Sequence, residues 1–530
     1  MKYLRRQVTF RAASNMKDLN KSSAIKISLV VFSLLVYTFI FTYRLDTFPP
    51  VWWDEGWTLA VARNWVEFGH YGQMLLGEPR GPGLSAAFPV VAPVALSFKL
   101  FGVGIWQGRL PGLFFTLGAI VFMVYLANIL YNRKAAMGTF IVLFFSQGHE
   151  TLNPILVGRQ VLGEMPLMFY LLGGYAFFLL CLKRSTWYIV PAVLFWGIAI
   201  KTKAQVLPFW VISLCLPLVF SLLKRWWHES FILLLALVGS WIMGLVVLWA
   251  QAVIIGQGTA PSDPLEGLYE VTAFVMDWNV RMVALFSVIY MGFPTLIALL
   301  WGGRELFRNF RYPLLPRAQF IIKFAIFSLT TSWLLWYLLL GSEWLRYLFP
   351  QLFFGAIYVG MLLSELIGGV NAGIGKVSRI IIINFNKSSR NAIWKTFLLG
   401  ILVIGFTLSL TTFQKGLLIR EDNSLRQLSS FFREQVFSDA VIETYDSELF
   451  FLIDQPYHYP PDQAHVEFNR QTLYGEEGGN IYAPTSIDYD YLAVGPFSKK
   501  WGVYDDVLAS GQLDIEFESD TYQVYRNRSK

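Results

Sequence analysis

Long runs of apolar residues, separated by short polar segments, recur along the chain from residue 27 to residue 413. A helix needs about 20 apolar residues to cross the hydrocarbon core of a bilayer, and fewer where neighbouring helices cover its ends. The pattern therefore predicts about eleven membrane-spanning helices, at 27–43, 110–130, 135–146, 165–182, 187–200, 204–223, 231–255, 282–301, 320–340, 347–367 and 396–413. The third and fifth of these are short.

The composition supports this interpretation. Of the 530 residues, 55% are hydrophobic and 15% are charged, whereas soluble globular chains have about 25% charged residues. The two cysteines, Cys181 and Cys215, lie inside apolar runs and are expected to pack as small hydrophobic residues. The apolar run 27–43 follows a basic N-terminus and has no small-residue cleavage site, so we expect a retained first span.

Lysine and arginine gather in alternate polar segments, which sets the predicted topology. Loops that face the cytoplasm carry an excess of these residues. The clusters are the N-terminus, 133–134, 183–184, 224–225, 304–317 and 376–395. This pattern predicts a cytoplasmic N-terminus and an extracytoplasmic C-terminus in a plasma (inner) membrane, since no organelle signal is evident. The clusters are short and separated by apolar spans, so the net charge of +7 does not indicate nucleic-acid binding.

Two segments break the regular pattern. Residues 84–101 are apolar but interrupted by Pro89 and Pro93, which favours an interfacial or re-entrant helix. From Gln414 onward the chain carries 20 acidic and 10 basic residues. Helical spacing at 424–435 and short strand-like runs at 441–445, 491–494 and 522–525 predict a small α+β domain. The expected fold is a polytopic α-helical membrane protein (residues 1–413), with a long outer first loop, followed by an extracytoplasmic α+β domain (residues 414–530).

Carboxylates near the outer face are the first candidate catalytic residues. Asp54 and Glu55 follow the first span among three tryptophans, where burial would make a carboxylate a better proton acceptor. An aromatic belt with solvated acids beside it is the alternative. Glu164 lies where the fourth span begins, on the same predicted face as Asp54. Stabilisation of a helix N-terminus would also explain Glu164.

Isolated cations on the predicted outer face form the second candidate group. They stand at the ends of spans or in the first loop, where the topology rule disfavours positive charge. A single such residue is explained by snorkelling of its side chain. Several of them suggest a common anionic ligand, and a lipid phosphate suits the guanidinium fork. The residues are Arg80, Lys203, Arg281 and Arg346.

In their order and sidedness, these residues resemble the protein O-mannosyltransferase-like branch of the membrane-embedded (GT-C) glycosyltransferases, which includes the lipid A aminoarabinose transferases. Asp54-Glu55 matches the acidic pair of the family's first loop. The stretch from Phe101 to Pro111 resembles the segment before its second span. Glu164-Met-Pro166 resembles the second acidic motif, in which the family usually has Asp. Later motifs of the family are resembled by Thr202-Lys203, Asn279-Val-Arg281 and Arg346-Tyr347. The loop at Arg80 differs, because this chain has Gly-Pro-Gly-Leu where relatives often have Lys-Pro-Pro-Leu.

The resemblance implies an inverting transfer of a monosaccharide from a polyprenyl-phosphate donor to an acceptor hydroxyl on a protein, a glycolipid or a saccharide. Asp54 would act as the general base, Glu164 would position the acceptor or assist Asp54, and Glu55 is the second candidate catalytic acid of the pair. The donor phosphate would be held by Arg281, Arg346, Tyr347, Lys203 and Arg80. Some relatives bring a divalent cation near the acidic residues, here Asp54 and Glu164. The sequence has no ligand cluster with metal-binding spacing, so metal dependence stays open.

Two other classes of protein compete with a glycosyltransferase. A transporter or flippase of a lipid-linked saccharide would explain the spans and the outer cations. Such proteins usually place ionisable groups within spans near the midplane of the bilayer, whereas acids are scarce inside these spans and Glu365 lies near an inner end. A sensor or scaffold whose tail binds a partner would need fewer spans as an anchor. The sequence therefore favours the transferase.

Overall fold

The structure is a computed structural model of the chain. It describes residues 31–32, 34–83, 86–145, 149–256, 274–312, 314–367, 423–474, 482, 484 and 487–528, with isolated positions between 397 and 411. The chain divides into two compact units, residues 1–45 and residues 46–530. In the first unit, residues 31–32 and 34–42 are helical, as predicted for this part of the first span.

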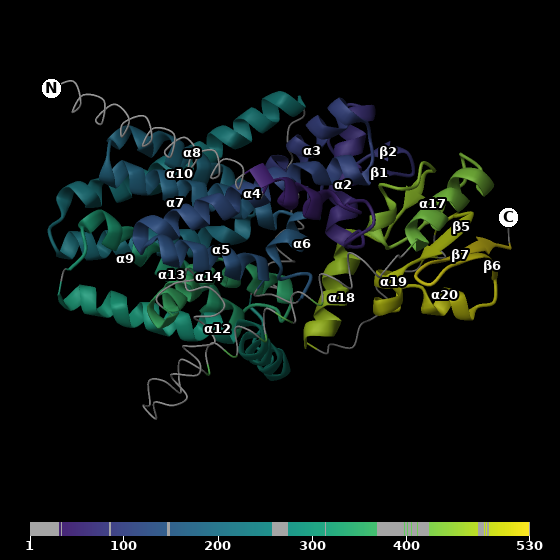
Figure 1. The fold of residues 1–530 in the computed structure, drawn as a ribbon. Helices are drawn as coiled ribbons and strands as arrows, with labels where there is room; N and C mark the ends of the chain where they lie inside the picture. The colour runs from purple at the N-terminus through teal and green to yellow at the C-terminus, as the bar shows by residue number, and fades with distance from the viewer. Residues whose placement is uncertain are drawn as a thin grey trace, which may run out of the picture. The chain divides into compact units, whose positions relative to one another are not determined.

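Long helices make up most of the second unit (Figure 1). Neighbouring helices in the bundle include α14 with α5 and α12, α8 with α7 and α10, and α9 with α13. The helices are α4 (Ile105–Leu130), α5 (Arg133–Phe145), α7 (Glu164–Lys183), α8 (Ile189–Thr202), α9 (Leu207–Leu223), α10 (Trp227–Ile255), α12 (Trp278–Arg311), α13 (Arg317–Leu339) and α14 (Leu345–Ile367), with the 3-10 turns η1 (Thr186–Tyr188) and η2 (Ala204–Val206) before α8 and α9.

Among the described residues, seven helices are long and apolar enough to cross a membrane. They are Ile105–Leu130, Glu164–Lys183, Ala204–Leu223, Trp227–Ile255, Trp278–Arg311, Arg317–Leu339 and Leu345–Glu365, and each overlaps a predicted span. The predicted short spans three and five are helices of 13 and 17 residues. These helices confirm the multi-span helical fold. The eleventh span lies almost wholly outside the described residues, so the total of about eleven stays a prediction.

The helices differ in how much apolar surface they expose. Large side chains of α10, such as Phe231, Trp241 and Trp249, are more than half exposed, as expected for a lipid-facing helix. In α14, by contrast, 94% of an apolar stretch of 18 residues is buried. Helix α14 thus lies inside the bundle, and its first turn carries Arg346.

The segment predicted to be the first outer loop, a name kept below, contains α2 (Trp53–Glu67), a two-stranded hairpin of β1 (Met74–Leu75) and β2 (Glu78–Pro79), and α3 (Phe88–Phe101). Helix α2 begins with two acids in its first turn, where they favour the positive end of the helix dipole. Helix α3 has 14 residues and packs against α2 and α4. It is shorter than a span requires, in line with the prediction that this segment does not cross the membrane.

The C-terminal part is the predicted α+β domain, here called the tail domain and defined by residues 423–528. Its five-stranded mixed sheet has the order β4-β3-β5-β7-β6, with parallel pairs at β4-β3-β5 and antiparallel pairs at β5-β7-β6. Its elements are α17 (Ser424–Gln435), β3 (Ile442–Glu443), η4 (Ser447–Leu449), β4 (Tyr457–His458), α18 (Asp462–Tyr474), β5 (Tyr491–Val494), α19 (Pro496–Trp501), α20 (Asp505–Ala509), β6 (Leu513–Glu518) and β7 (Gln523–Asn527). The predicted helix and all three predicted strands are present.

One apolar core joins the tail domain to the first outer loop. It contains residues of α2 and α3, such as Trp57 and Phe98, together with Phe431, Phe450 and Val524 of the tail domain. Figure 1 shows α17 and the sheet on the same side of the bundle as α2 and α3. The tail domain and the first outer loop therefore lie on the same side of the helix bundle.

Candidate active site at the start of α2

Glu55 is fully buried and bound to Arg109, a residue of α4. Arg109 Nε donates to Glu55 Oε1 at 2.7 Å and Arg109 Nη2 donates to Glu55 Oε2 at 2.6 Å, while both side chains have 0% exposure. The N–H of Val161 also donates to Glu55 Oε1 at 2.9 Å. Arg109 Nη1 donates to the carbonyl of Pro49 at 2.9 Å. Glu55 thus ties the first loop to α4 and to the segment before Glu164.

Asp54, one residue earlier, faces a different environment. Its Oδ2 forms an ion pair with Nη1 of Arg346, which belongs to the first turn of α14. The exposed fractions of the two side chains are 22% and 21%, so this pair is accessible where the Glu55 pair is not. Arg346 also lies over the rings of Trp344 and Tyr347, with its guanidinium carbon 5.7 and 5.5 Å from their centres.

A second acid–cation pair adjoins the first. Lys203 Nζ forms an ion pair with Oε1 of Glu164, and Glu164 interacts electrostatically with both Arg346 and Asp54. Lys203 follows α8 and Glu164 begins α7, so three separate helix ends converge here with the start of α2. We call Asp54, Glu164, Lys203 and Arg346 the acidic–basic cluster. Each of its two acids is paired with one of its two cations.

His465, from α18 of the tail domain, joins this cluster. Its ring stacks on Trp53, with centres 4.9 Å apart and planes 12° from parallel. Its Nδ1 shares a hydrogen bond of 2.7 Å with the hydroxyl of Tyr445. Burial lowers the pKa of His465 to about 4; Asp54 opposes this shift and Arg346 adds to it. His465 is therefore neutral at pH 7.

The backbone of the tail domain also docks on the first turn of α2. The Trp53 indole donates to the carbonyl of Tyr445 at 3.2 Å, and the Ser447 hydroxyl donates to the carbonyl of Trp53 at 2.6 Å. A side chain at Gly56 would collide with the backbone of Glu448. The turn that carries Asp54 is thus held by the tail domain on one side and by Arg109 on the other.

Arg281 lies beside the loop that leads to Arg346. Its Nη1 donates to the carbonyl of Tyr337 at 3.0 Å, and its Nη2 contacts the carbonyl of Gly341. The Nε atoms of Arg281 and Arg346 are buried and have no hydrogen-bond partner among the residues that the structure describes. Buried donors are normally bonded, so these two atoms are exceptions within the described part of the chain.

Two other residues predicted to bind the donor phosphate have contrasting surroundings. Tyr347 is buried, and its carbonyl accepts a hydrogen bond from the Trp333 indole at 2.9 Å. Arg80 is exposed at the end of the β1-β2 hairpin, where its backbone pairs with Gln73. No contact recorded for the described residues brings Arg80 to the acidic–basic cluster. The structure therefore groups Lys203, Arg346 and Tyr347 with Asp54, and leaves Arg80 apart.

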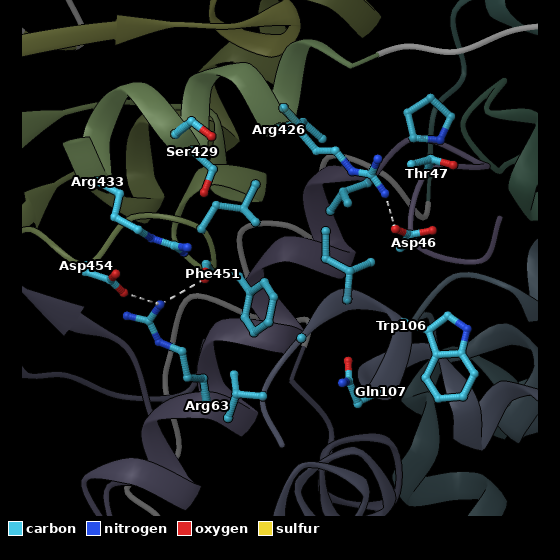
Figure 2. Close-up of a pocket in the computed structure, with 18 of the residues that line it drawn as sticks. Asp46, Thr47, Arg63, Trp106, Gln107, Arg426, Ser429, Arg433, Phe451 and Asp454 are labelled. Atoms are coloured by element: carbon cyan, nitrogen blue, oxygen red, sulfur yellow. Dashed lines mark hydrogen bonds and ion pairs between the residues drawn. The ribbon is translucent and has the colours of Figure 1, made fainter. Parts of the chain in front are cut away.

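A pocket of about 650 Å³ lies on another face of the first loop (Figure 2). Arg63 of α2 and Arg433 of α17 point into it, and Arg426 pairs with Asp46 at its edge. Asp54 and Arg63 are nine positions apart, which at 3.6 residues per turn places them on opposite faces of α2. No member of the acidic–basic cluster lines this pocket.

The divalent cation expected near Asp54 and Glu164 stays a prediction. Each carboxylate is already paired with a cation. Within the described ranges, no group of three or more His, Cys, Asp or Glu side chains comes together as a metal site requires.

Solved membrane proteins share this architecture. ArnT from Cupriavidus metallidurans superimposes with a TM-score of 0.62 in the apo state, at 15% identity over 96% of this chain and 99% of ArnT. The form bound to undecaprenyl phosphate gives 0.61, at 15% identity over 94% and 97%. Both ArnT and the oligosaccharyltransferase AglB are GT-C glycosyltransferases. The chain has the GT-C fold.

AglB from Archaeoglobus fulgidus, in complex with an inhibitory peptide and a dolichol-phosphate, is a more distant structural match. Its TM-score is 0.52, at 11% identity over 94% of this chain and 74% of AglB. No protein-family model matches the sequence, and no curated protein sequence matches it. The GT-C fold of this chain is thus established by structure, which the resemblance of its motifs had led us to expect.

Sequence reasoning did not give a role to three residues of the site. Arg109 was part of a recognised stretch, but nothing in that stretch showed that it would pair with Glu55. His465 and Tyr445 belong to a domain whose docking on α2 joins residues 392 positions apart. A single polar residue in an amphipathic tail helix carries no signal for such a contact.

Proposed function

We propose that this protein is an inverting glycosyltransferase that moves a monosaccharide from a polyprenyl-phosphate donor to an extracytoplasmic acceptor hydroxyl, with Asp54 as the general base. The observation that carries the proposal is the accessible Asp54–Arg346 pair beside Glu164 and Lys203. It sets a proton acceptor next to cations with donors for a phosphate. The GT-C fold, shared with proteins solved with undecaprenyl phosphate or dolichol-phosphate bound, adds independent support.

The reaction has a simple balance. The acceptor hydroxyl gives its proton to the Asp54 carboxylate as its oxygen bonds to the anomeric carbon of the sugar. The bond from that carbon to the phosphate oxygen breaks on the opposite face, and the electron pair leaves with the lipid phosphate. Attack from the opposite face inverts the anomeric configuration. A general base of this kind contributes about 10²–10⁴ in rate.

Arg346 and Lys203 are placed to stabilise the negative charge that grows on the leaving phosphate. In the free protein, Arg346 pairs with Asp54 and Lys203 pairs with Glu164. A phosphate that draws these cations toward itself would release the Asp54 carboxylate to face the acceptor. Glu164 then positions the acceptor or supports Asp54. The spare Nε donors of Arg281 and Arg346 suit the phosphate oxygens, with Tyr347 beside them.

Arg80 would approach the phosphate only through movement of its exposed hairpin, so its predicted role depends on donor binding. We place the reaction on the extracytoplasmic face of a plasma (inner) membrane, with the N-terminus in the cytoplasm. A C-terminal alkaline phosphatase fusion should then be active and a green-fluorescent fusion dark. A bright fluorescent fusion would put Asp54 and the tail domain on the cytoplasmic side.

Transfer is tested with purified protein in liposomes, a radiolabelled polyprenyl-phosphate monosaccharide and a membrane extract as the source of acceptor. The proposal predicts that label leaves the donor and enters a protein, glycolipid or saccharide fraction. A transporter or flippase would instead move intact labelled donor between leaflets. Label that stays on the lipid carrier while the donor crosses the bilayer would overturn the proposal.

A further inference from the structure

The tail domain touches the helix turn that carries Asp54 through both its backbone and its side chains. We propose that the tail domain completes the active site, with His465 as a positioning residue that fixes Trp53 and thereby the direction of Asp54. This inference rests on the proposed function, since it assigns His465 a role in the reaction of Asp54. Nothing in the fold alone requires a soluble domain to reach the site.

The contacts around Trp53 define its position closely. Its indole stacks with both His465 and Trp57, with ring centres 4.9 and 5.6 Å away. Its N–H donates to the carbonyl of Tyr445, and its own carbonyl accepts from Ser447. The Tyr445 hydroxyl then bonds His465 Nδ1 at 2.7 Å. Trp53, Tyr445 and His465 thus form a closed set of contacts, so a shift of one ring is resisted by the others.

The groups that face His465 explain why its role is positional. Asp54 and Arg346 are the charged groups that act on its ring, and their effects on it have opposite signs. The imidazole is partly buried and, with its pKa lowered to about 4, neutral at pH 7, so it adds no charge to the site. Its contribution is a flat ring of fixed orientation, set by one hydrogen bond and one stacking contact.

Position matters to the rate because a misplacement of about 1 Å at a reacting group can cost about 100-fold. Asp54 directly follows Trp53 at the start of a helix, so a tilt of Trp53 carries the carboxylate with it. The ion pair with Arg346 would survive a small tilt, since a flexible arginine follows its partner. We therefore expect loss of His465 to lower kcat and to leave donor binding unchanged.

The test compares His465→Ala, His465→Phe and Tyr445→Phe in the full-length protein. The readouts are kcat and KM with the labelled polyprenyl-phosphate monosaccharide, and binding of undecaprenyl phosphate alone. His465→Ala removes the ring and the hydrogen bond, and should lower kcat about 10- to 100-fold. His465→Phe keeps a ring on Trp53 and should recover part of this loss. The double variant His465→Phe, Tyr445→Phe should be no slower than His465→Phe, because both changes remove the same bond.

Tyr504→Phe is the matched control. Tyr504 is buried in the same domain, and its hydroxyl donates to Glu443 at 2.9 Å, away from Trp53. Its kcat should stay within about two-fold of wild type. If Asp54→Asn is inactive, the proposed function stands. Two results would then overturn the inference about His465 alone. One is wild-type kcat in folded His465→Ala, and the other is an equal loss in Tyr504→Phe. An active Asp54→Asn protein would instead refute the proposed function itself.

Discussion

The surroundings of Asp54 and Glu55 differ far more than their adjacent positions suggest. Glu55 has 0% exposure and accepts two hydrogen bonds from Arg109 and one from the backbone of Val161. Asp54 keeps 22% of its side chain exposed and pairs with an arginine that is itself accessible. One step along a helix turns a side chain by about 100°, which here separates a fully buried ion pair from a partly exposed one.

The contrast shows what makes an ion pair available for chemistry. A buried pair with all its hydrogen bonds satisfied resists change, because removal of either partner leaves an uncompensated charge. A partly exposed pair costs less to rearrange and can exchange its partner for a ligand. We therefore expect substitutions at Glu55 to affect folding and substitutions at Asp54 to affect turnover.

The largest effect is expected for Asp54→Asn. Asparagine is nearly isosteric but cannot accept the proton of the acceptor, so kcat should fall about 10²–10⁴-fold. The melting temperature and the affinity for undecaprenyl phosphate should stay close to wild type. Single-turnover transfer of a labelled sugar measures the rate. A rate within a few-fold of wild type would return Asp54 to the alternative of a solvated acid beside an aromatic belt.

Glu55→Gln should show the reverse pattern. The substitution leaves Arg109 buried without a charged partner, which typically costs about 3–5 kcal/mol of stability. This cost is measured by thermal unfolding in detergent, which is monitored as the loss of the monodisperse peak in size-exclusion chromatography. The molecules that remain folded should retain most of their turnover. An unchanged melting temperature would mean that the Glu55–Arg109 pair does not hold the loop.

Arg346→Ala tests the cation of the accessible pair. Loss of one donor to a developing negative charge typically costs about 10²–10³ in kcat, and donor affinity should also fall. Arg346→Lys should recover only part, because lysine keeps the charge but loses the fork. Arg433→Ala, which removes an exposed arginine from the pocket in Figure 2, serves as the control and should behave as wild type. Equal donor affinity in all three variants would place the phosphate elsewhere.

Glu164→Gln is expected to have a smaller effect. Glu164 pairs with Lys203. In the proposed mechanism it supports the site without taking the proton, so kcat should fall about ten-fold, within the range for residues that orient a reactant. The change should also free Lys203 and leave donor affinity equal or tighter. A loss as large as that of Asp54→Asn would instead assign the base to Glu164.

Glu448→Gln should be the mildest change, although Glu448 is as buried as Glu55. Burial, with Asp446 nearby, raises the pKa of Glu448 well above its ordinary value. A carboxyl whose pKa is raised on folding stabilises the protein below its unfolded pKa, and this contribution is lost as the pH rises. At pH 7, glutamine should thus match or exceed wild-type stability, within about 1 kcal/mol. Marked destabilisation at pH 7 would show that Glu448 is needed as a charge.

The sequence predicted those parts of the fold that depend on local pattern. Helix α17 occupies the predicted residues 424–435, and the strand at 491–494 also matches, because amphipathic spacing and turn residues act over short distances. The seven long apolar helices follow from hydropathy alone. The predicted site residues Asp54, Glu164, Lys203 and Arg346 converge because they stand at helix ends on one side of the bundle.

The local sequence pattern could not predict which residues far apart in the chain would be in contact. Whether Asp54 or Glu55 would be buried depended on which face of α2 met α4, and periodicity at a helix start does not determine this. The contact of His465 with Trp53 joins an outer loop to a domain several hundred residues later, and its strength comes from ring geometry. Such contacts are set by how domains pack, which residue types along the chain do not encode locally.

The most direct test measures turnover per folded molecule for Asp54→Asn and Glu55→Gln side by side, with the same labelled polyprenyl-phosphate monosaccharide. Folded protein is quantified by size-exclusion chromatography before each reaction, so that rate and stability are separated. We predict that turnover per folded molecule falls at least about 100-fold in Asp54→Asn and stays within a few-fold of wild type in Glu55→Gln. Equal turnover per folded molecule in the two variants would contradict the division of roles between these neighbouring carboxylates.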